Sequence, residues 1–351
     1  MPMISMRQLL DHARENNYGI PAFNINCMEQ LLGVVQAAAE TDSPLILQST
    51  LGYGDIRILH HQVMAVTEMH PYLPVCLNLD HGSSLDICAR ALTNGFTSVM
   101  RDGSLMEDKK TPATYEFNVE QTRKVVQFAH ACGMSVEGEI GVIGSLETGM
   151  AGKEDGHGAE GKLDHSQLVT SPEEAASFVK DTHVDALAIA CGTSHGAHKF
   201  TRKPDSDILN IDIIQKIAAK IPNTPLVMHG ASSVPEELRD KINKFGGDLK
   251  ETYGVPHEAV IKAIKFGICK VNIDTDSRMA FTAAVREVIA TKPEEFDPRK
   301  YLIKGQEAQA KICKQYYEMF GAAGQASKIK AIPLPQMAKM YKEGRFDPVI
   351  K

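Results

Sequence analysis

Short apolar runs alternate with longer amphipathic stretches along most of the chain. The apolar runs lie at residues 19–26, 44–50, 75–81, 96–104, 134–141, 185–195, 225–233 and 269–276. Between them, stretches such as MEQLLGVVQAAAETD and ILNIDIIQKIAAKI place apolar residues on one helix face, and several follow a serine or aspartate that can cap a helix. Eight buried strands, each followed by a helix, predict an α/β fold: a single (β/α)8 TIM barrel over residues 1–351.

The remaining segments refine this picture. The main alternative is an open doubly wound sheet, but no G-x-G-x-x-G segment follows the first apolar run. The N-terminal MPMISMRQLLDHAREN has the pattern of an amphipathic helix rather than of a signal peptide. Beyond residue 280 the pattern is helical and too long for one barrel-closing helix. We expect this C-terminal helical extension, residues 280–351, to contact another copy of the chain in a homo-oligomer (dimer or tetramer).

Composition narrows the possible partners and compartment. The net charge of −6 and the pI near 6.1 make nucleic acid an unexpected partner. Seven cysteines are scattered without a C-x-x-C pair, which is typical of a reducing compartment and argues against a zinc–cysteine cluster. No apolar run reaches 18 residues, so we expect no membrane contact. A cytoplasmic enzyme fits these observations.

Ionisable side chains gather where the predicted strands end. In a parallel barrel these carboxyl-terminal ends meet at one mouth, where the active site lies. His81, His195 and His229 follow three different predicted strands. Three histidines can hold a zinc ion and leave one coordination position open for substrate, so a catalytic Zn²⁺ site is predicted here. Other polar or ionisable residues at the same ends are Asp80, Glu137, Glu139, His198, Asn272, Asp274 and Asp276.

Glycine and hydroxyl residues follow the last three predicted strands. The segments GTSHGAHKF, HGASS and NIDTDS can turn backbone N–H groups toward an anion. Barrels commonly bind phosphate in the loops after their last two strands. Lys199 could supply the positive charge, although each segment could also be a tight turn and nothing more. The sequence therefore predicts a phosphorylated substrate.

Five motifs in register resemble the class II, metal-dependent fructose-bisphosphate aldolases. They are LDHGSS, VEGEIG, GTSHGAHKF, MHGASS and KVNIDTDSRMA, and FGAAGQASKIKAI resembles the Calvin-cycle-type subgroup. The resemblance covers essentially the whole chain. It implies a zinc-dependent lyase of glycolysis and gluconeogenesis that cleaves fructose 1,6-bisphosphate to dihydroxyacetone phosphate and glyceraldehyde 3-phosphate. Aldolases for tagatose bisphosphate and other ketose bisphosphates share most of these motifs and remain the alternative.

The same resemblance implies a role for each matching residue. His81, His195 and His229 match the zinc ligands, Asp80 the acid–base residue at the C4 hydroxyl, and Glu139 a carboxylate behind the metal site. Arg278 matches a contact of the distal phosphate. The carbonyl of Ser194, with neighbouring glycine and serine residues, resembles a site for a monovalent cation (K⁺ or Na⁺). Residues that match the substrate and phosphate pocket are Ser49, Gly196, Lys199, Gly230, Ser232, Asn272, Asp274 and Thr275.

The glycine-rich segment 141–165 is long and polar, as a mobile lid over the active site would be. The family carries a proton-shuttling glutamate in such a segment, and Glu154 matches it. Lys153 stands where many relatives have a first glutamate, so Glu147 is an alternative. His198 stands where relatives often have tyrosine, and we expect it in the pocket rather than on the metal.

Two rival functions can be weighed on the sequence. A metal-dependent hydrolase on the same barrel usually carries H-x-H on its first strand, where this chain has FNIN. A protein that only binds a metal or a sugar phosphate would need neither Asp80 nor a glutamate in the lid segment. We therefore favour the hypothesis that the protein is an aldolase over both rival functions.

Overall fold

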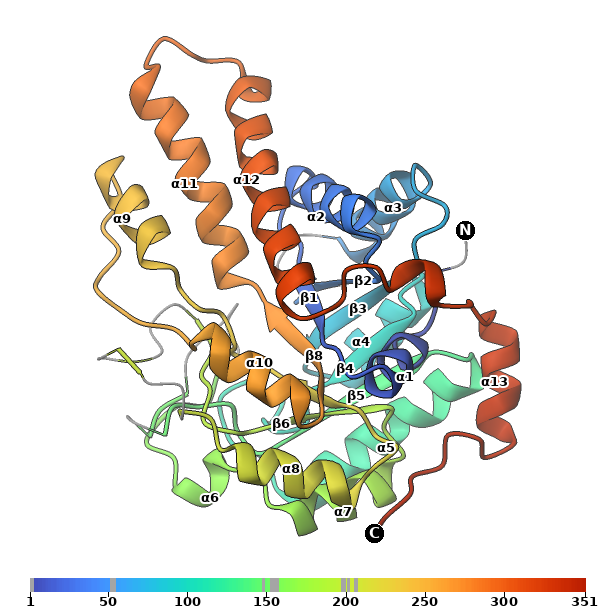
Figure 1. The fold of residues 1–351 in the computed structure, drawn as a ribbon. Helices are drawn as coiled ribbons and strands as arrows, with labels where there is room; N and C mark the ends of the chain where they lie inside the picture. The colour runs from blue at the N-terminus through green and yellow to red at the C-terminus, as the bar shows by residue number, and fades with distance from the viewer. Residues whose placement is uncertain are drawn as a thin grey trace.

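Eight parallel strands close into a barrel in the computed structural model, which describes residues 3–50, 55–146, 149–151, 158–196, 200, 203–204 and 208–351 (Figure 1). The (β/α)8 TIM barrel predicted from the sequence is thereby confirmed. The strands neighbour one another in chain order, and β1 pairs with β8 to close the ring. They are β1 (Ile20–Asn24), β2 (Leu45–Ser49), β3 (Val75–Gly82), β4 (Ser98–Arg101), β5 (Ser135–Ile140), β6 (Ala186–Ile189), β7 (Leu226–Met228) and β8 (Ile268–Ile273).

Helices surround the barrel, because every strand residue is buried and both faces of the sheet must be covered. The helices are α1 (Met6–Glu15), α2 (Met28–Thr41), α3 (Ile56–Thr67), α4 (Leu85–Thr93), α5 (Tyr115–Ala131), α6 (His165–Leu168), α7 (Pro172–Thr182), α8 (Ile211–Lys220), α9 (Glu236–Lys244), α10 (His257–Lys265), α11 (Thr275–Thr291), α12 (Pro298–Met319), the 3₁₀ helix η1 (Ala326–Lys328) and α13 (Leu334–Lys342). Side-chain caps fix several starts, such as Ser84 before α4 and Thr114 before α5.

Strand β3 is irregular near its carboxyl end. Its pairing with β4 shifts register between Leu79 and Gly82, and His81 adopts a φ of 51°. Such irregularities turn side chains away from strict alternation and are frequent beside active sites. Asp80 and His81 can therefore both face the barrel mouth, although they are neighbours in a strand.

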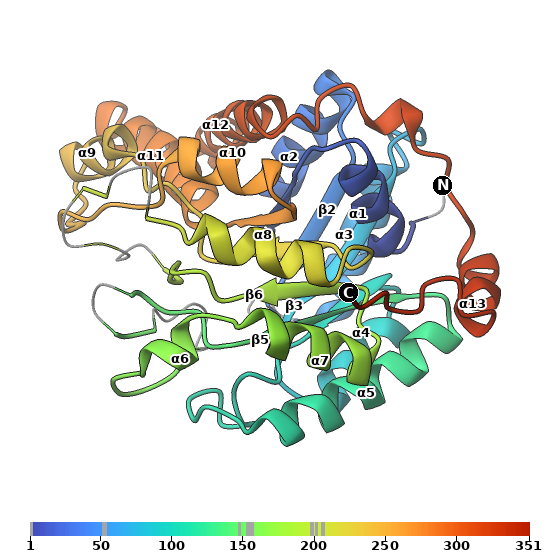
Figure 2. The ribbon, with the colours of Figure 1, turned by 60° about the horizontal axis from the view of Figure 1, so that its bottom comes forward.

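The C-terminal helices cover one side of the barrel and extend past it. Helix α11 begins at Thr275, directly after β8. In Figure 1, α11 and α12 project beyond the barrel at the upper left, with α9 beside them. Figure 2 places α13 at the other end of the molecule, where it packs near α5. The last helices thus reach both ends of the barrel.

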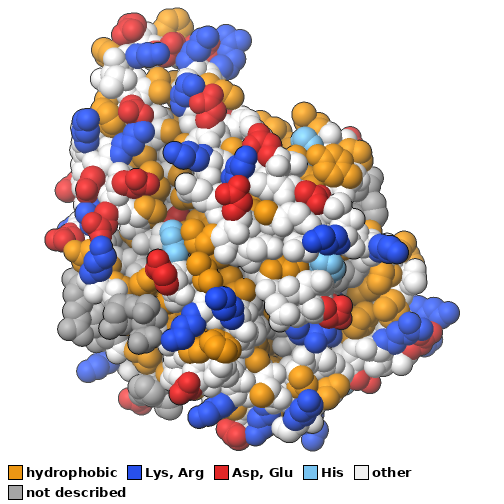
Figure 3. Space-filling model, in the orientation of Figure 1, with side chains coloured by type: hydrophobic (Ala, Val, Ile, Leu, Met, Phe, Trp, Pro, Cys, Tyr) orange, Lys and Arg blue, Asp and Glu red, His pale blue; other side chains and the backbone are white. Residues whose placement is uncertain are grey.

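The surface carries mixed charge. On the face seen in Figure 3, acidic and basic side chains are interspersed rather than gathered into one basic patch. Within the described residues, no helix is long and apolar enough to cross a membrane. The cysteines are free thiols, and five of the seven are buried.

Candidate active site

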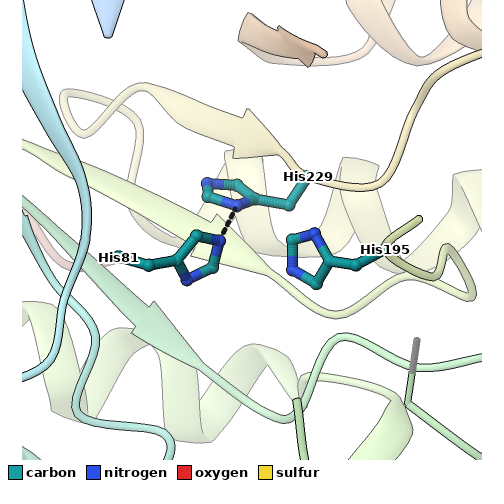
Figure 4. A group of neighbouring side chains, drawn as sticks. All are labelled: His81, His195 and His229. Atoms are coloured by element: carbon teal, nitrogen blue, oxygen red, sulfur yellow. Dashed lines mark hydrogen bonds between the residues drawn. The ribbon is translucent and has the colours of Figure 1, made fainter. Parts of the chain in front are cut away.

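Three histidines meet at the carboxyl ends of the barrel strands. His81 lies near the end of β3, His195 follows β6 and His229 directly follows β7. One nitrogen from each ring lies within 4.8 Å of the others, and all three residues are buried. Figure 4 shows the rings pointing toward one another. The structure thus brings together the three residues that the sequence analysis proposed as metal ligands.

Carboxylates behind two of the rings fix their tautomers. His81 Nδ1 lies 2.9 Å from Asp102 Oδ2, and His229 Nε2 lies 2.8 Å from Glu137 Oε1. Because a carboxylate accepts, each of these nitrogens carries the proton and donates. The opposite nitrogens, His81 Nε2 and His229 Nδ1, then face each other 3.2 Å apart. A positive charge between them, either a proton on His81 or a metal ion, satisfies both nitrogens.

A divalent metal ion fits this arrangement. Two nitrogens that bind one tetrahedral zinc ion at their usual bond lengths lie about 3.3 Å apart. Neutral imidazoles oriented by carboxylates are common zinc ligands, and the carboxylates raise the basicity of the rings. Nitrogen donors of this kind also suit cobalt and other transition metals. The donor set itself therefore supports a metal site.

The electrostatics of the site favour a cation. Burial alone would lower the pKa of His81, but the carboxylates of Asp80 and Asp102 outweigh burial and raise it to about 10. For His229, burial lowers the pKa even with Glu137 beside it, so this ring favours its neutral form. A neutral imidazole is the form that binds a metal.

Glu137 joins His229 to a buried lysine. Its two oxygens lie 2.8 Å from His229 Nε2 and 2.8 Å from Lys270 Nζ, and all three side chains have no exposed surface. Burial would raise the pKa of Glu137, but Lys270 and His229 outweigh this and lower it to about 2. The carboxylate therefore stays ionised and can hold the ring of His229.

Glu139 lies one contact further from the histidines. The Ser104 hydroxyl lies 2.9 Å from Glu139 Oε1 and 2.7 Å from Asp102 Oδ1, so it links the two carboxyl groups. Burial and the charge of Asp102 raise the pKa of Glu139 well above its ordinary value. A small cavity lies between this group, His81 and His195. Glu139 thus lies behind the cluster, while Asp102 and Glu137 touch the rings.

Asp80 is held by amide side chains from three other strands. Asn24 Nδ2 donates to its Oδ2 at 3.0 Å, Gln48 Nε2 to the same oxygen at 3.3 Å, and Asn272 Nδ2 to its Oδ1 at 3.2 Å. Asp80 is 3% exposed, so the carboxylate lies at the base of the mouth rather than in open solvent. The Asn272 amide also lies 3.3 Å from His229 Nδ1, which places Asp80 beside the histidine cluster.

Small residues let the loops after β6 and β7 approach each other closely. Gly230 has a φ of 62°, and a Cβ at this position would lie 2.5 Å from the Ser194 carbonyl oxygen. Thr193 Oγ1 also donates to the His229 carbonyl at 2.7 Å. Only glycine fits this approach. The other described residues proposed for the substrate pocket that are buried near these strand ends are Ser49, Ser232, Asn272, Asp274 and Thr275.

Arg278 and Asp274 form a close ion pair in the first turn of α11. Arg278 Nε donates to Asp274 Oδ1 at 2.7 Å, and its second nitrogen lies 2.7 Å from Oδ2. The Arg278 side chain is 38% exposed while Asp274 is 6% exposed. The guanidinium is therefore oriented by its partner and still reaches solvent.

Several residues proposed from the sequence lie outside the described part of the structure: Lys199, Glu154, Glu147, Lys153 and His198. Gly196 is described and has a φ of 75°. Described parts of the glycine-rich segment 141–165 pack on the loop after β4: Leu163 and Val142 share a small apolar cluster with Leu105. Glu160 also pairs with Lys110 at 3.1 Å.

Several supporting residues of the site are not among those predicted from the sequence. Asp102 follows β4 just as Asp80 lies at the end of β3, so the strand-end rule would have found it. Lys270, Asn24 and Gln48 lie within strands, and a charged or amide side chain inside an apolar strand is itself a signal of an internal polar network. Their partners lie on other strands, which the linear sequence does not reveal.

Comparison with known proteins identifies the family of this chain. A family model described as "Fructose-bisphosphate aldolase class-II" matches residues 4–325. The fructose-bisphosphate aldolase of Stutzerimonas stutzeri is 58% identical over the full length of both chains. That of Nostoc commune is 55% identical over 100% of this chain and 99% of its own. The crystal structure of the YdjI aldolase from Escherichia coli K12 matches with a TM-score of 0.69 at 27% identity, covering 93% of this chain and 100% of that one. The chain belongs to the class II fructose-bisphosphate aldolase family.

Proposed function

We propose that this protein cleaves fructose 1,6-bisphosphate into dihydroxyacetone phosphate and glyceraldehyde 3-phosphate, and catalyses the reverse condensation, with a divalent metal ion held by His81, His195 and His229. The observation that carries the proposal is the pair of facing nitrogens of His81 and His229, 3.2 Å apart, each with its other nitrogen on a carboxylate. Three histidines that leave a fourth coordination position open are a common ligand set of catalytic zinc sites. When bound, the ion would act as a Lewis acid for the negative charge that develops on the three-carbon fragment.

Asp80 is proposed to take the proton from the C4 hydroxyl of the sugar during cleavage and to return it during condensation. The amides of Asn24, Gln48 and Asn272 supply hydrogen bonds that fix the carboxylate. A fixed acid–base group beside the reacting carbon lowers the barrier because it is already in place when the bond breaks. Glu154 is proposed to exchange the proton on the carbon of the other fragment, with Glu147 as the alternative.

The substrate phosphates are proposed to bind in the loops after the last three strands. Gly196, Gly230 and Ser232 offer backbone or hydroxyl donors, Asn272, Asp274 and Thr275 line the neighbouring strand end, and Ser49 lies at the end of β2. Lys199 and Arg278 supply positive charge, Arg278 at the distal phosphate. A monovalent cation (K⁺ or Na⁺) near the Ser194 carbonyl is part of the same proposal.

A covalent lysine mechanism is not needed. Lys270 lies inside the barrel, but its ammonium lies 2.8 Å from Glu137 and has no exposed surface. A Schiff-base lysine must present a free amine to the substrate carbonyl. Lys270 is therefore proposed to stabilise Glu137, and borohydride should not trap a substrate adduct on it.

We also propose a cytoplasmic homo-oligomer. Free thiols suit a reducing compartment. Exposed apolar side chains on the projecting part of the chain, Ile289 of α11 at 50% and Phe296 of the α11–α12 connection at 91% exposure, support a contact between copies there. Light scattering on purified protein tests this, and a monomer at all concentrations would contradict it.

The decisive assay compares fructose 1,6-bisphosphate with tagatose 1,6-bisphosphate. When formation of the triose products is measured, kcat/KM should be higher for fructose 1,6-bisphosphate than for tagatose 1,6-bisphosphate. A preference for tagatose bisphosphate would move the protein to the alternative within ketose-bisphosphate aldolases. No cleavage of either sugar by metal-loaded protein would refute the proposed function.

A further inference from the structure

The backbone adopts an unfavourable conformation near the end of the loop that joins β7 to α9. Val234 has a φ of 49°, in the left-handed region, and it is buried at 2% exposure. A β-branched residue rarely adopts this conformation, because its side chain crowds the backbone there. Other contacts must therefore hold the segment in place. The segment follows Gly230 and Ser232, which are proposed to bind phosphate.

A buried carboxylate holds this segment. Asp276, in the first turn of α11, has no exposed surface. Its oxygens accept from the Ser233 backbone N–H at 2.7 Å, the Val234 N–H at 2.8 Å and the Ser233 hydroxyl at 3.0 Å. Hydrogen bonds to an ionised acceptor are stronger than those between neutral groups. Asp276 can therefore offset the strain at Val234.

A tyrosine from α12 completes the carboxylate's contacts. The Tyr316 hydroxyl donates to Asp276 Oδ2 and lies 3.4 Å from His257 Nε2. Burial and the charge of Asp276 raise the pKa of this phenol well above its ordinary value, so the hydroxyl keeps its proton and remains a donor. The ring is 2% exposed and packs edge-on against Phe23 of β1. Tyr316 is thus fixed by the barrel wall.

The opposite side of the segment is equally confined. The Ser232 carbonyl accepts from the Val255 N–H at 3.1 Å. A Cβ at Gly254 would lie 2.4 Å from the Ser232 carbonyl oxygen and 2.3 Å from the Ser233 carbonyl carbon. Ser232 and Ser233 are therefore held between Gly254 and Asp276. A shift of Asp276 would be transmitted to Ser232, because the backbone has no room to absorb it.

We propose that Tyr316 and Asp276 are positioning residues for the substrate phosphate: through the amides of Ser233 and Val234 they hold Ser232 where a phosphate can bind. The inference rests on the proposed function, since phosphate contact by Ser232 is part of that proposal. It assigns to helix α12, which follows the barrel, a role in substrate affinity, although Tyr316 itself does not touch the substrate.

Two adjacent tyrosines provide a matched test. Tyr316→Phe removes the donor to Asp276 and keeps the ring. Tyr317→Phe removes a hydroxyl that has no hydrogen-bond partner among the described residues, on an equally buried ring. Tyr316→Phe should raise KM for fructose 1,6-bisphosphate about fivefold with kcat changed less than about twofold, as loss of one charge-assisted hydrogen bond predicts. Inhibition by inorganic phosphate should weaken by a similar factor. Tyr317→Phe should change neither.

A second variant covers the case in which Tyr316→Phe does not fold. Ser233→Ala removes one donor to Asp276 and leaves both backbone amides, so it should raise KM about twofold. Suppose that wild-type protein is active. The inference is then wrong if Tyr316→Phe has the same KM and the same phosphate inhibition as Tyr317→Phe. If Tyr316→Phe does not fold, Ser233→Ala takes its place in this comparison. It is also wrong if only kcat falls. Wild-type protein that cleaves no sugar bisphosphate would instead refute the proposed function.

Discussion

His81 shows how one residue's backbone can decide what a strand delivers. In a regular strand, neighbouring side chains point to opposite faces, so Asp80 and His81 could not serve one site. The register shift in β3 and the φ of 51° at His81 remove that restriction. Asp80 meets the amides of Asn24 and Gln48, while His81 meets Asp102 and His229. A proposed acid–base group and a proposed metal ligand therefore reach the same mouth.

Asp80→Asn tests the role of this carboxylate. The amide fills the same space but cannot accept a proton, so kcat should fall by about two or more orders of magnitude. Metal content and inhibition by a substrate analogue should stay near wild type, because neither needs the proton transfer. Steady-state kinetics and metal analysis measure both. Asp86→Asn is the control, since Asp86 is 78% exposed on α4. A rise in KM alone would show that Asp80 only positions the sugar.

At this scale, the sequence predicts residues at strand ends better than residues inside strands. His81, His195 and His229 were found because each follows an apolar run, and the structure brings their rings together. Glu137 was noted as ionisable, yet its link to His229 and Lys270 depends on contacts between strands β5, β7 and β8. Such contacts arise only when the barrel closes, so no local pattern reveals them.

The loops after β6 and β7 meet at Ser194 and Gly230, where their backbones approach closely. Gly230→Ala should disturb this contact in two ways, by strain at φ 62° and by a Cβ placed 2.5 Å from the Ser194 carbonyl oxygen. Displacement near a catalytic centre can reduce rates strongly, and we expect kcat/KM to fall about tenfold or more. Steady-state kinetics with the sugar bisphosphate measures the loss.

Gly324→Ala separates the two effects. Gly324 has a φ of 75°, but a Cβ there would have no neighbour within 4 Å. This variant should lower the free energy of unfolding by about 1 kcal/mol and leave kcat/KM unchanged. Equal effects of the two variants on kcat/KM would show that the close approach of the two loops does not matter for activity.

Another contact between elements attaches α13 to the end of the barrel where the strands begin. Asp185, at 1% exposure, accepts from His130 Nε2 at 2.8 Å, from the Tyr341 hydroxyl at 2.7 Å and from the Val136 N–H at 2.8 Å. Burial alone would raise the pKa of Asp185, but His130 and Arg7 outweigh it and hold the pKa below its ordinary value. The carboxylate thus stabilises the fold only while ionised.

Asp185→Asn should lower the free energy of unfolding by about 3 kcal/mol at pH 7, because it removes the charge from a buried network. A group whose pKa is depressed by folding contributes stability above its unfolded pKa and loses it as the pH falls through the folded value. The difference between wild type and variant should therefore be complete above about pH 4 and shrink below it. Denaturant unfolding at several pH values measures this. A difference that stays constant down to pH 2 would contradict it.

The elements themselves were largely predictable. Each of the eight apolar runs overlaps a barrel strand, because a strand buried on both faces must be apolar. Boundaries were less accurate: the run at 185–195 becomes β6 only over Ala186–Ile189, and its remainder forms the loop that carries His195. The contacts of α13 with Asp185 could not be predicted, since they join residues more than 150 positions apart.

At the scale of the whole molecule, parallel strand direction accounts for where the chemistry lies. Every strand runs the same way, so residues from positions 24 to 276 reach one end of the barrel. The other end carries structural contacts such as Asp185 with Tyr341. The contacts that stabilise the fold and the proposed active site thus lie at opposite ends of the barrel. A variant at one end should therefore leave the contacts at the other end intact.

The central claim is that a metal ion held by the three histidines drives the reaction, and metal removal with paired metal analysis tests it most directly. Protein as purified should contain about one divalent ion per chain, lose activity in step with its metal during exhaustive chelation, and recover on addition of zinc or cobalt. Full cleavage of fructose 1,6-bisphosphate by protein that retains less than about one ion per ten chains would contradict the account.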